Sequence, residues 1–163
     1  MNSITFTPET IDLTEIKAFC RVDGTADDTL LTFLYEAACE EALSYAHVVL
    51  GSADITADTV WASSYELPYW PVGSITSVKV YVDGVETTDT EYELLDGVIY
   101  PSIGSEGERM VIVYSAGFAT MPADVKHAVY QRIKFSFDFG DDMPYAAPRF
   151  FDRIVGRYRR NFA

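Results

Sequence analysis

The chain has 163 residues, of which 48% are hydrophobic and 14% aromatic. That is enough apolar material for one packed domain, so the composition excludes a wholly disordered chain. The net charge is −13, but residues 145–163 carry +4 and residues 1–144 carry −17. An acidic body repels nucleic acid, whereas a basic end is attracted to acidic surfaces. No apolar run approaches the ~20 residues of a membrane span, and the first residues lack the pattern of a signal peptide. We therefore expect a protein made in a cytoplasm, with no membrane partner.

Residues 5–11 read as an extended or irregular lead-in. The sequence from Asp12 to Glu15 then fits a capping box, in which Asp12 caps the first helical N–H groups and Glu15 reaches back to the Asp12 N–H. Ile11 and Ile16 stand at the positions of a hydrophobic staple. A short helix is predicted over residues 13–20.

A polar turn over residues 21–28 leads into a long helix predicted over residues 27–49. Apolar residues recur there at spacings of three and four, which is typical of an amphipathic core helix. The turn is rich in acids but lacks the spacing of an EF-hand calcium loop. Cys20 and Cys39 fall at apolar helix positions, which predicts two buried thiols and no disulfide.

The middle of the chain predicts antiparallel strands. Residues 51–58 read as a polar loop, and Pro68 and Pro71 exclude a central strand between them. Asp83-Gly84 and Asp96-Gly97 are typical of tight hairpin turns, because such turns require positive φ. We expect four or five strands covered on one face by helices. The predicted strands span residues 59–67, 77–82, 92–95, 98–100 and 109–114.

Residues 114–128 predict a strand, a turn and a helix in succession. Met110, Ile112 and Tyr114 alternate as in a half-buried strand, and Gly117 permits the turn. Pro122 and Asp124 suit the first turn of a helix. Its core face is predicted to contain Val125, Ala128, Val129 and Ile133.

The C-terminal residues predict an amphipathic helix opened by Pro148. Arginines at 149, 153, 157 and 160 form a basic stripe beside an apolar stripe of Phe150, Phe151, Ile154, Val155 and Tyr158. Three interpretations stay open: docking to an acidic protein surface, packing on its own domain, and nucleic-acid binding, which the acidic body disfavours. An acidic loop is expected at Asp138–Met143.

We find no catalytic, cofactor-binding or metal-ligating pattern in the sequence. It lacks a P-loop, a Gly-x-Gly-x-x-Gly motif, a Gly-x-Ser-x-Gly elbow and paired Cys or His ligands. His47 and His127 are interpreted as structural or exposed residues. The sequence predicts no cofactor and no enzymatic activity.

Three stretches together resemble the head–tail connector (adaptor, or head-completion) proteins of tailed phages. The first is the short helix, Arg-Val-Asp turn and start of the long helix over residues 13–38. The others are the Pro-Val-Gly-Ser-Ile-Thr-Ser-Val run at 71–78 and the Tyr-x-Ala-Gly-aromatic … Pro-x-Asp-Val-Lys-x-Ala pattern at 114–128. The resemblance covers most of the chain from Leu13 to Arg160, and order and spacing carry it more than any single motif. The acidic loop and the aromatics near Pro68–Pro71 depart from the family pattern.

The resemblance implies an α+β fold and a structural virion protein at the neck, assembled in the host cytoplasm. Its implied partners are the portal protein, copies of itself in a ring of about twelve, and the next connector, stopper or tail protein. DNA would pass through the ring without sequence-specific binding, past repelling carboxylates. The implied portal-docking residues are Arg149, Phe150, Phe151, Arg153, Ile154, Arg157, Tyr158, Arg159, Arg160 and Phe162. Contacts to a neighbour or the tail are expected at Asp83, Gly84, Thr87, Thr88, Asp89 and Thr90.

The predicted organisation is one α+β connector domain over residues 1–148 and a basic docking segment over residues 149–163. Two alternatives remain open at this point. One is another phage morphogenesis or tail-completion component. The other is a small enzyme or ligand-binding domain, which would show a concave pocket with perturbed titratable groups.

Overall fold

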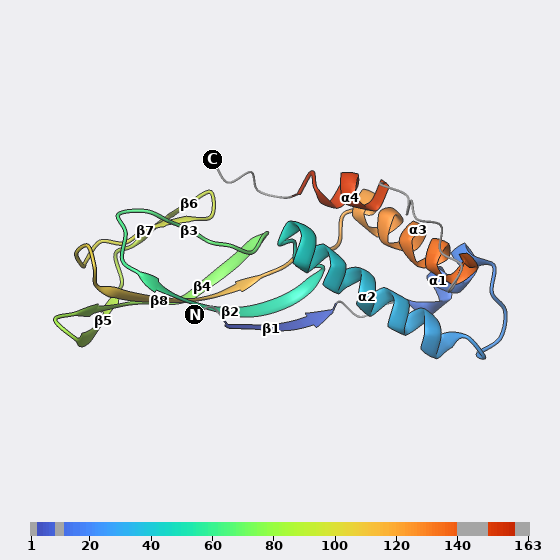
Figure 1. Ribbon diagram of the computed structural model, residues 1–163, viewed down its shortest axis with the longest axis horizontal. Helices are drawn as coiled ribbons and strands as arrows, with labels where there is room; N and C mark the ends of the chain where they lie inside the picture. The colour runs from blue at the N-terminus through green and yellow to red at the C-terminus, as the bar shows by residue number, and fades with distance from the viewer. Residues whose placement is uncertain (1–2, 9–11, 140–149, 159–163) are drawn as a thin grey trace. The chain divides into compact units, whose positions relative to one another are not determined.

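The computed structural model describes residues 3–8, 12–139 and 150–158 (Figure 1). By its internal contacts the chain forms two compact units. We call Met1–Thr7 with Ser52–Gly117 the β unit, and Pro8–Gly51 with Phe118–Ala163 the helical unit. The β unit contains eleven acids and two bases, a net charge of −9, and the helical unit fourteen acids and ten bases, a net charge of −4.

The β unit contains two antiparallel sheets. The larger has the order β1-β2-β8-β4-β5 and the smaller the order β3-β7-β6. Figure 1 shows β8 running between β2 and β4. With the four helices described below, these sheets confirm the predicted α+β class. The strands are β1 Ser3–Pro8, β2 Gly51–Val60, β3 Tyr65–Glu66, β4 Val72–Val82, β5 Val85–Asp89, β6 Glu93–Leu95, β7 Val98–Tyr100 and β8 Arg109–Ala116.

Both Asp-Gly turns form as predicted, and all four of their residues have positive φ, between 51° and 79°. They join β4 to β5 and β6 to β7. In β8, the alternation of Met110, Ile112 and Tyr114 is confirmed, since all three side chains are fully buried. The predicted strand at 77–82 is the second half of the longer β4.

The prediction of a polar loop over residues 51–58 is wrong. These residues form most of β2 and pair with β8 from Ala53↔Ala116 to Val60↔Arg109. The strand alternates between buried Ala53, Ile55 and Ala57 and more exposed polar residues. Its buried face is built from small side chains, so a hydrophobicity pattern alone did not reveal it. The strand predicted over 59–67 is accordingly split, because β2 ends at Val60 and β3 covers only residues 65–66.

The helical unit contains α1 Leu13–Cys20, α2 Asp28–Ala46, α3 Ala123–Phe139 and α4 Phe150–Val155. The bounds of α1 are as predicted, and the Asp12 side chain accepts a hydrogen bond from the Thr14 N–H at 2.8 Å. Cys20 and Cys39 are both buried, as expected. Asp138, assigned to a loop from the sequence, belongs to the last turn of α3.

The second half of the predicted capping box is wrong. The Glu15 carboxylate accepts a hydrogen bond from the Tyr130 hydroxyl at 2.8 Å and pairs with Lys126 on α3. These bonds, first from Lys126 and then from Tyr130, lower the pKa of Glu15. Burial and the bond to Glu15 raise the pKa of Tyr130 to about 12. Glu15 therefore ties α1 to α3, because two charged or polar partners there outcompete a local backbone N–H.

Candidate docking surfaces

The short helix α4 packs its apolar face inside the helical unit, while Arg153 on the helix and Arg157 just after it are exposed. Phe151, Ile154 and Val155 are buried, and α4 lies against α3 and α2 (Figure 1). The predicted amphipathic character of this helix is therefore confirmed. Its apolar face packs against other helices of the same chain.

Tyr158 fastens the end of this segment to the start of α3. Its hydroxyl donates to the Asp124 carboxylate at 2.8 Å, and this bond raises the pKa of Tyr158. Its ring meets Phe118 edge-on, with centroids 5.5 Å apart. The two exposed arginines are thus presented on a segment fixed at both its apolar face and its end.

The structure places only part of the predicted portal-docking set. Phe151, Arg153, Ile154, Arg157 and Tyr158 are seen, and Phe150 begins α4. The remaining predicted members, Arg149, Arg159, Arg160 and Phe162, lie outside the described residues. Portal docking through this set stays a prediction, and the exposed described residues that could carry it are Arg153 and Arg157.

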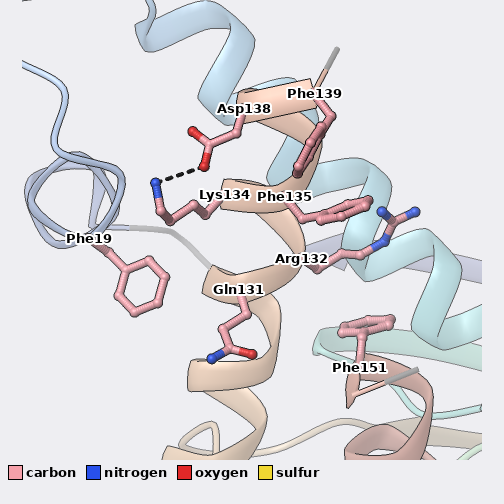
Figure 2. A pocket seen from close by; sticks show the side chains of 8 residues that line it. All are labelled: Phe19, Gln131, Arg132, Lys134, Phe135, Asp138, Phe139 and Phe151. Carbon is pink, nitrogen blue, oxygen red and sulfur yellow. Dashed lines mark ion pairs between the residues drawn. The ribbon is translucent and has the colours of Figure 1, made fainter. Parts of the chain in front are cut away.

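An aromatic pocket of about 400 Å³ opens beside α4 (Figure 2). Phe19 from α1 and Phe151 from α4 contribute to its wall, and α3 provides the remaining residues. Phe135 and Phe139, one turn apart on α3, lie with ring centroids 4.8 Å apart. The pocket is lined by Phe19, Gln131, Arg132, Lys134, Phe135, Asp138, Phe139 and Phe151.

The charged residues of this pocket pair within the helical unit. Lys134 and Asp138 form an ion pair at 2.9 Å, drawn in Figure 2. Arg132 pairs with Glu41 on α2 at 2.9 Å and donates to the Ser136 hydroxyl at 3.1 Å. With its carboxylate paired and its walls aromatic, the pocket suits an apolar or aromatic side chain better than acid–base chemistry.

The predicted contact residues at the β4–β5 hairpin divide into two kinds. Asp83, Gly84, Thr87, Thr88 and Thr90 are exposed. Asp89 is only 2% exposed. A contact of all six residues with a neighbour or the tail stays a prediction. Because its side chain is buried, Asp89 has a structural role within the chain.

Asp89 closes the loop that follows β5. Its carboxylate accepts from the Ser102 N–H at 2.6 Å, from the Ser102 hydroxyl at 2.5 Å and from the Glu91 N–H at 3.0 Å. Burial raises the pKa of Asp89, but these hydrogen bonds outweigh it and lower the pKa below its ordinary value. Asp89 therefore holds the end of β5 to the segment that contains Ser102.

Sequence reasoning missed one exposed apolar surface on α2. Phe33 is 63% exposed and Leu30 46% exposed. Leu31 and Tyr35 of the same helix are buried. The helical periodicity identified the core face, but it gave no indication that the opposite face also contains large apolar residues.

The histidines and cysteines lie at positions in or next to the helices of the helical unit. His47 caps the end of α2, and His127 meets the Phe19 ring edge-on with centroids 5.7 Å apart. Burial raises the pKa of the Cys20 thiol, which disfavours the reactive thiolate. Among the residues that the structure describes, no group of three His, Cys, Asp or Glu side chains could hold a metal ion. In the same part of the chain, no helix is both long and apolar enough to span a bilayer.

The structure is thus a small α+β protein with exposed arginines at 153 and 157, an aromatic pocket and an exposed apolar surface on α2. Residues 10–68 match the family described as phage gp6-like head-tail connector protein. The match confirms the predicted resemblance to head–tail connectors for this stretch. It covers α1, α2, β2 and β3.

Solved structures share this fold over the whole chain. A chain in the neck of an empty gene transfer agent (GTA) particle, computed with C6 symmetry, has a TM-score of 0.79 at 19% identity, covering 100% of this chain and 97% of that one. A chain from the virion of the native GTA particle has a TM-score of 0.77 at 21% identity with the same coverage. A chain in the neck of the native particle, computed with C12 symmetry, has a TM-score of 0.67 at 20% identity, covering 98% and 97%. No curated protein sequence matches the chain.

Proposed function

We propose that this protein is a head–tail connector, a structural protein in the neck of a phage-like particle. The observation that carries the proposal is the family match over residues 10–68, on a chain whose whole fold resembles a GTA neck protein at a TM-score of 0.79. The role is structural rather than catalytic. Because its charged residues are paired, the aromatic pocket favours binding of an apolar side chain over acid–base catalysis.

In this proposal the chain assembles as a ring beneath the portal. Neck structures computed with C6 and C12 symmetry, which contain chains of this fold, support a ring. A closed ring needs two different complementary patches on each subunit. The ring would be assembled in the host cytoplasm and would continue the channel for DNA toward a stopper or tail protein.

The exposed arginines in and just after α4 are the proposed contact to the portal. Arg153 and Arg157 are exposed on a segment whose other face is buried, so they present charge without needing the helix to detach. Arginine suits an acidic protein surface because its guanidinium makes paired hydrogen bonds to carboxylates. The β unit, with a net charge of −9, would repel the DNA backbone and allow passage without binding.

Electron microscopy of the protein mixed with the portal protein encoded nearest its gene tests this proposal. We expect a ring of added density beneath the portal. Single charge reversals Arg153→Glu and Arg157→Glu should each weaken binding, and more at low salt than at high salt, because exposed charges are screened. Arg21→Glu, an equal charge change at another exposed position, is the matched control.

Two results would contradict the proposal. Absence of any portal association of the unaltered protein at every salt concentration would remove the connector role. A loss with Arg153→Glu that is equal at all salt concentrations, or equal to that of Arg21→Glu, would remove the arginine contact. Truncation before residue 149 is a poorer test, because it also removes the buried Phe151, Ile154 and Val155.

A further inference from the structure

The five-stranded sheet ends in two edge strands, β1 and β5. An edge strand offers a row of backbone N–H and C=O groups to another chain. Within the described residues, no strand pairs with the outer side of either one. The same sheet therefore has two different free edges at its opposite ends.

The register of the β4–β5 hairpin identifies which groups of β5 point outward. The two-residue turn at Asp83-Gly84 places Val82 opposite Val85 as the first hydrogen-bonded pair. In an antiparallel ladder, hydrogen-bonded and non-hydrogen-bonded pairs alternate. Glu86 and Thr88 are therefore the residues whose backbone N–H and C=O groups face away from β4.

The β5 edge is held in place and is exposed. Glu86 accepts hydrogen bonds from Lys79 at 2.6 Å and from the Tyr81 hydroxyl at 2.8 Å, both on β4. Buried Asp89 fixes the end of the strand. The four residues before Asp89 are exposed. Proline and lysine commonly protect edge strands from pairing, and the sequence of β5 contains neither.

Charge decides which strand suits this edge. Pairing of β5 with β5 of another copy would bring the charged Glu86 residues of the two strands together. The strand β1, with the sequence Ser-Ile-Thr-Phe-Thr-Pro, contains no charged residue. Its Ile4, Thr5 and Phe6 are residue types that favour strands.

We propose that β5 of one copy pairs, through the backbone groups of Glu86 and Thr88, with β1 of the next copy, so that the sheet continues from subunit to subunit. This inference rests on the proposed ring. It supplies the two different patches that a closed ring requires, since β1 and β5 are opposite edges of one sheet. The exposed threonines of β5 then lie at a subunit interface.

Proline substitution at Thr88 tests the pairing. Thr88→Pro removes an outward N–H and leaves the ladder to β4 intact, which is the setting in which edge strands tolerate proline. Thr88→Ala keeps the N–H and is the matched control. On portal particles we expect a ring with the unaltered protein and with Thr88→Ala, and loss of the ring with Thr88→Pro. A complete ring with folded Thr88→Pro would overturn the pairing and leave the connector role standing. No ring with the unaltered protein would overturn the connector role.

Cross-linking gives a second measurement that does not depend on the proline variant folding. Thr5→Cys and Thr88→Cys each place a thiol on an exposed residue of one edge, while Cys20 and Cys39 are buried. With a short bis-maleimide on assembled rings, we expect linked dimers when the two variants are mixed and not with either alone. Dimers with Thr88→Cys alone or with Thr5→Cys alone, or no dimers in the mixture, would overturn the proposal.

Discussion

Replacing Asp89 with asparagine removes one charge from a buried carboxylate while changing its size very little. Both carboxylate oxygens are in use: one accepts from the Ser102 hydroxyl and the Glu91 N–H, and the other from the Ser102 N–H. An amide has one acceptor oxygen and one NH2 donor. In either orientation of the Asp89→Asn amide, its NH2 group faces a backbone N–H.

The expected loss of stability follows from these bonds. Leaving one buried N–H without an acceptor costs ~1–3 kcal/mol. Exchanging the remaining charge-assisted hydrogen bonds for neutral ones costs ~1 kcal/mol more. We therefore expect Asp89→Asn to lower the free energy of unfolding by about 3 kcal/mol at pH 7.

The pH dependence has a defined sign. The folded pKa of Asp89 lies below its ordinary value of 3.8. A carboxylate with a lowered pKa contributes stability above its unfolded pKa, and this stability is lost as pH falls through the folded pKa. The difference between the unaltered protein and Asp89→Asn should be constant above about pH 5 and shrink below about pH 4.

Urea unfolding followed by tryptophan fluorescence measures this difference, because both tryptophans, Trp61 and Trp70, belong to the β unit. Glu91→Gln removes a carboxylate from an exposed residue two positions away and is the control. Equal stability of Asp89→Asn and the unaltered protein at pH 7 would refute the proposed anchoring. A difference that is as large at pH 3 as at pH 7 would refute the electrostatic account.

Two further predictions concern packing. Gly104→Ala should destabilise the β unit by ~2–4 kcal/mol in urea, because a Cβ there would lie 2.6 Å from the Trp61 ring at a φ of +105°. Gly107→Ala is the control, because Gly107 has a similar φ of +94° but a Cβ there would meet no other atom, so this variant measures the backbone strain alone. Equal losses of stability in the two variants would contradict the predicted clash with Trp61. Phe151→Ala should cost ~3–5 kcal/mol in thermal unfolding followed by helical circular dichroism. Phe33→Ala is the control: because the Phe33 side chain is 63% exposed, its loss should change the free energy of unfolding by no more than ~0.5 kcal/mol. Similar losses of stability for Phe151→Ala and Phe33→Ala would show that α4 is not packed as described.

Elements with a strong local signal could be predicted from the sequence. The bounds of α1 followed from its capping residue, and both hairpin turns followed from Asp-Gly pairs whose residues need positive φ. The buried face of α3 followed from its periodicity, as Val125, Ala128, Val129 and Ile133 are all buried. In each case the determining interaction lies within a few residues along the chain.

Elements that depend on distant partners could not be predicted in the same way. The strand β2 is defined by its pairing with β8, some sixty residues later. The Glu15 carboxylate bonds to Lys126 and Tyr130, more than a hundred residues later in the chain. A rule based on neighbouring residues assigns it to the Asp12 N–H instead. The sequence predicted that Asp89 contacts a neighbour or the tail, whereas its bonds to Ser102, thirteen residues later, account for its burial.

Composition and local patterns were enough to predict the α+β class, the resemblance to head–tail connectors, the acidic body with a basic end, and the amphipathic character of the last helix. Tertiary contacts were needed to find that the apolar half of α4 is buried while Arg153 and Arg157 are exposed. The tertiary structure alone placed β1 and β5 at opposite edges of one sheet. Periodicity reports which side chains share a face, whereas which partner covers that face depends on contacts between residues far apart in the chain.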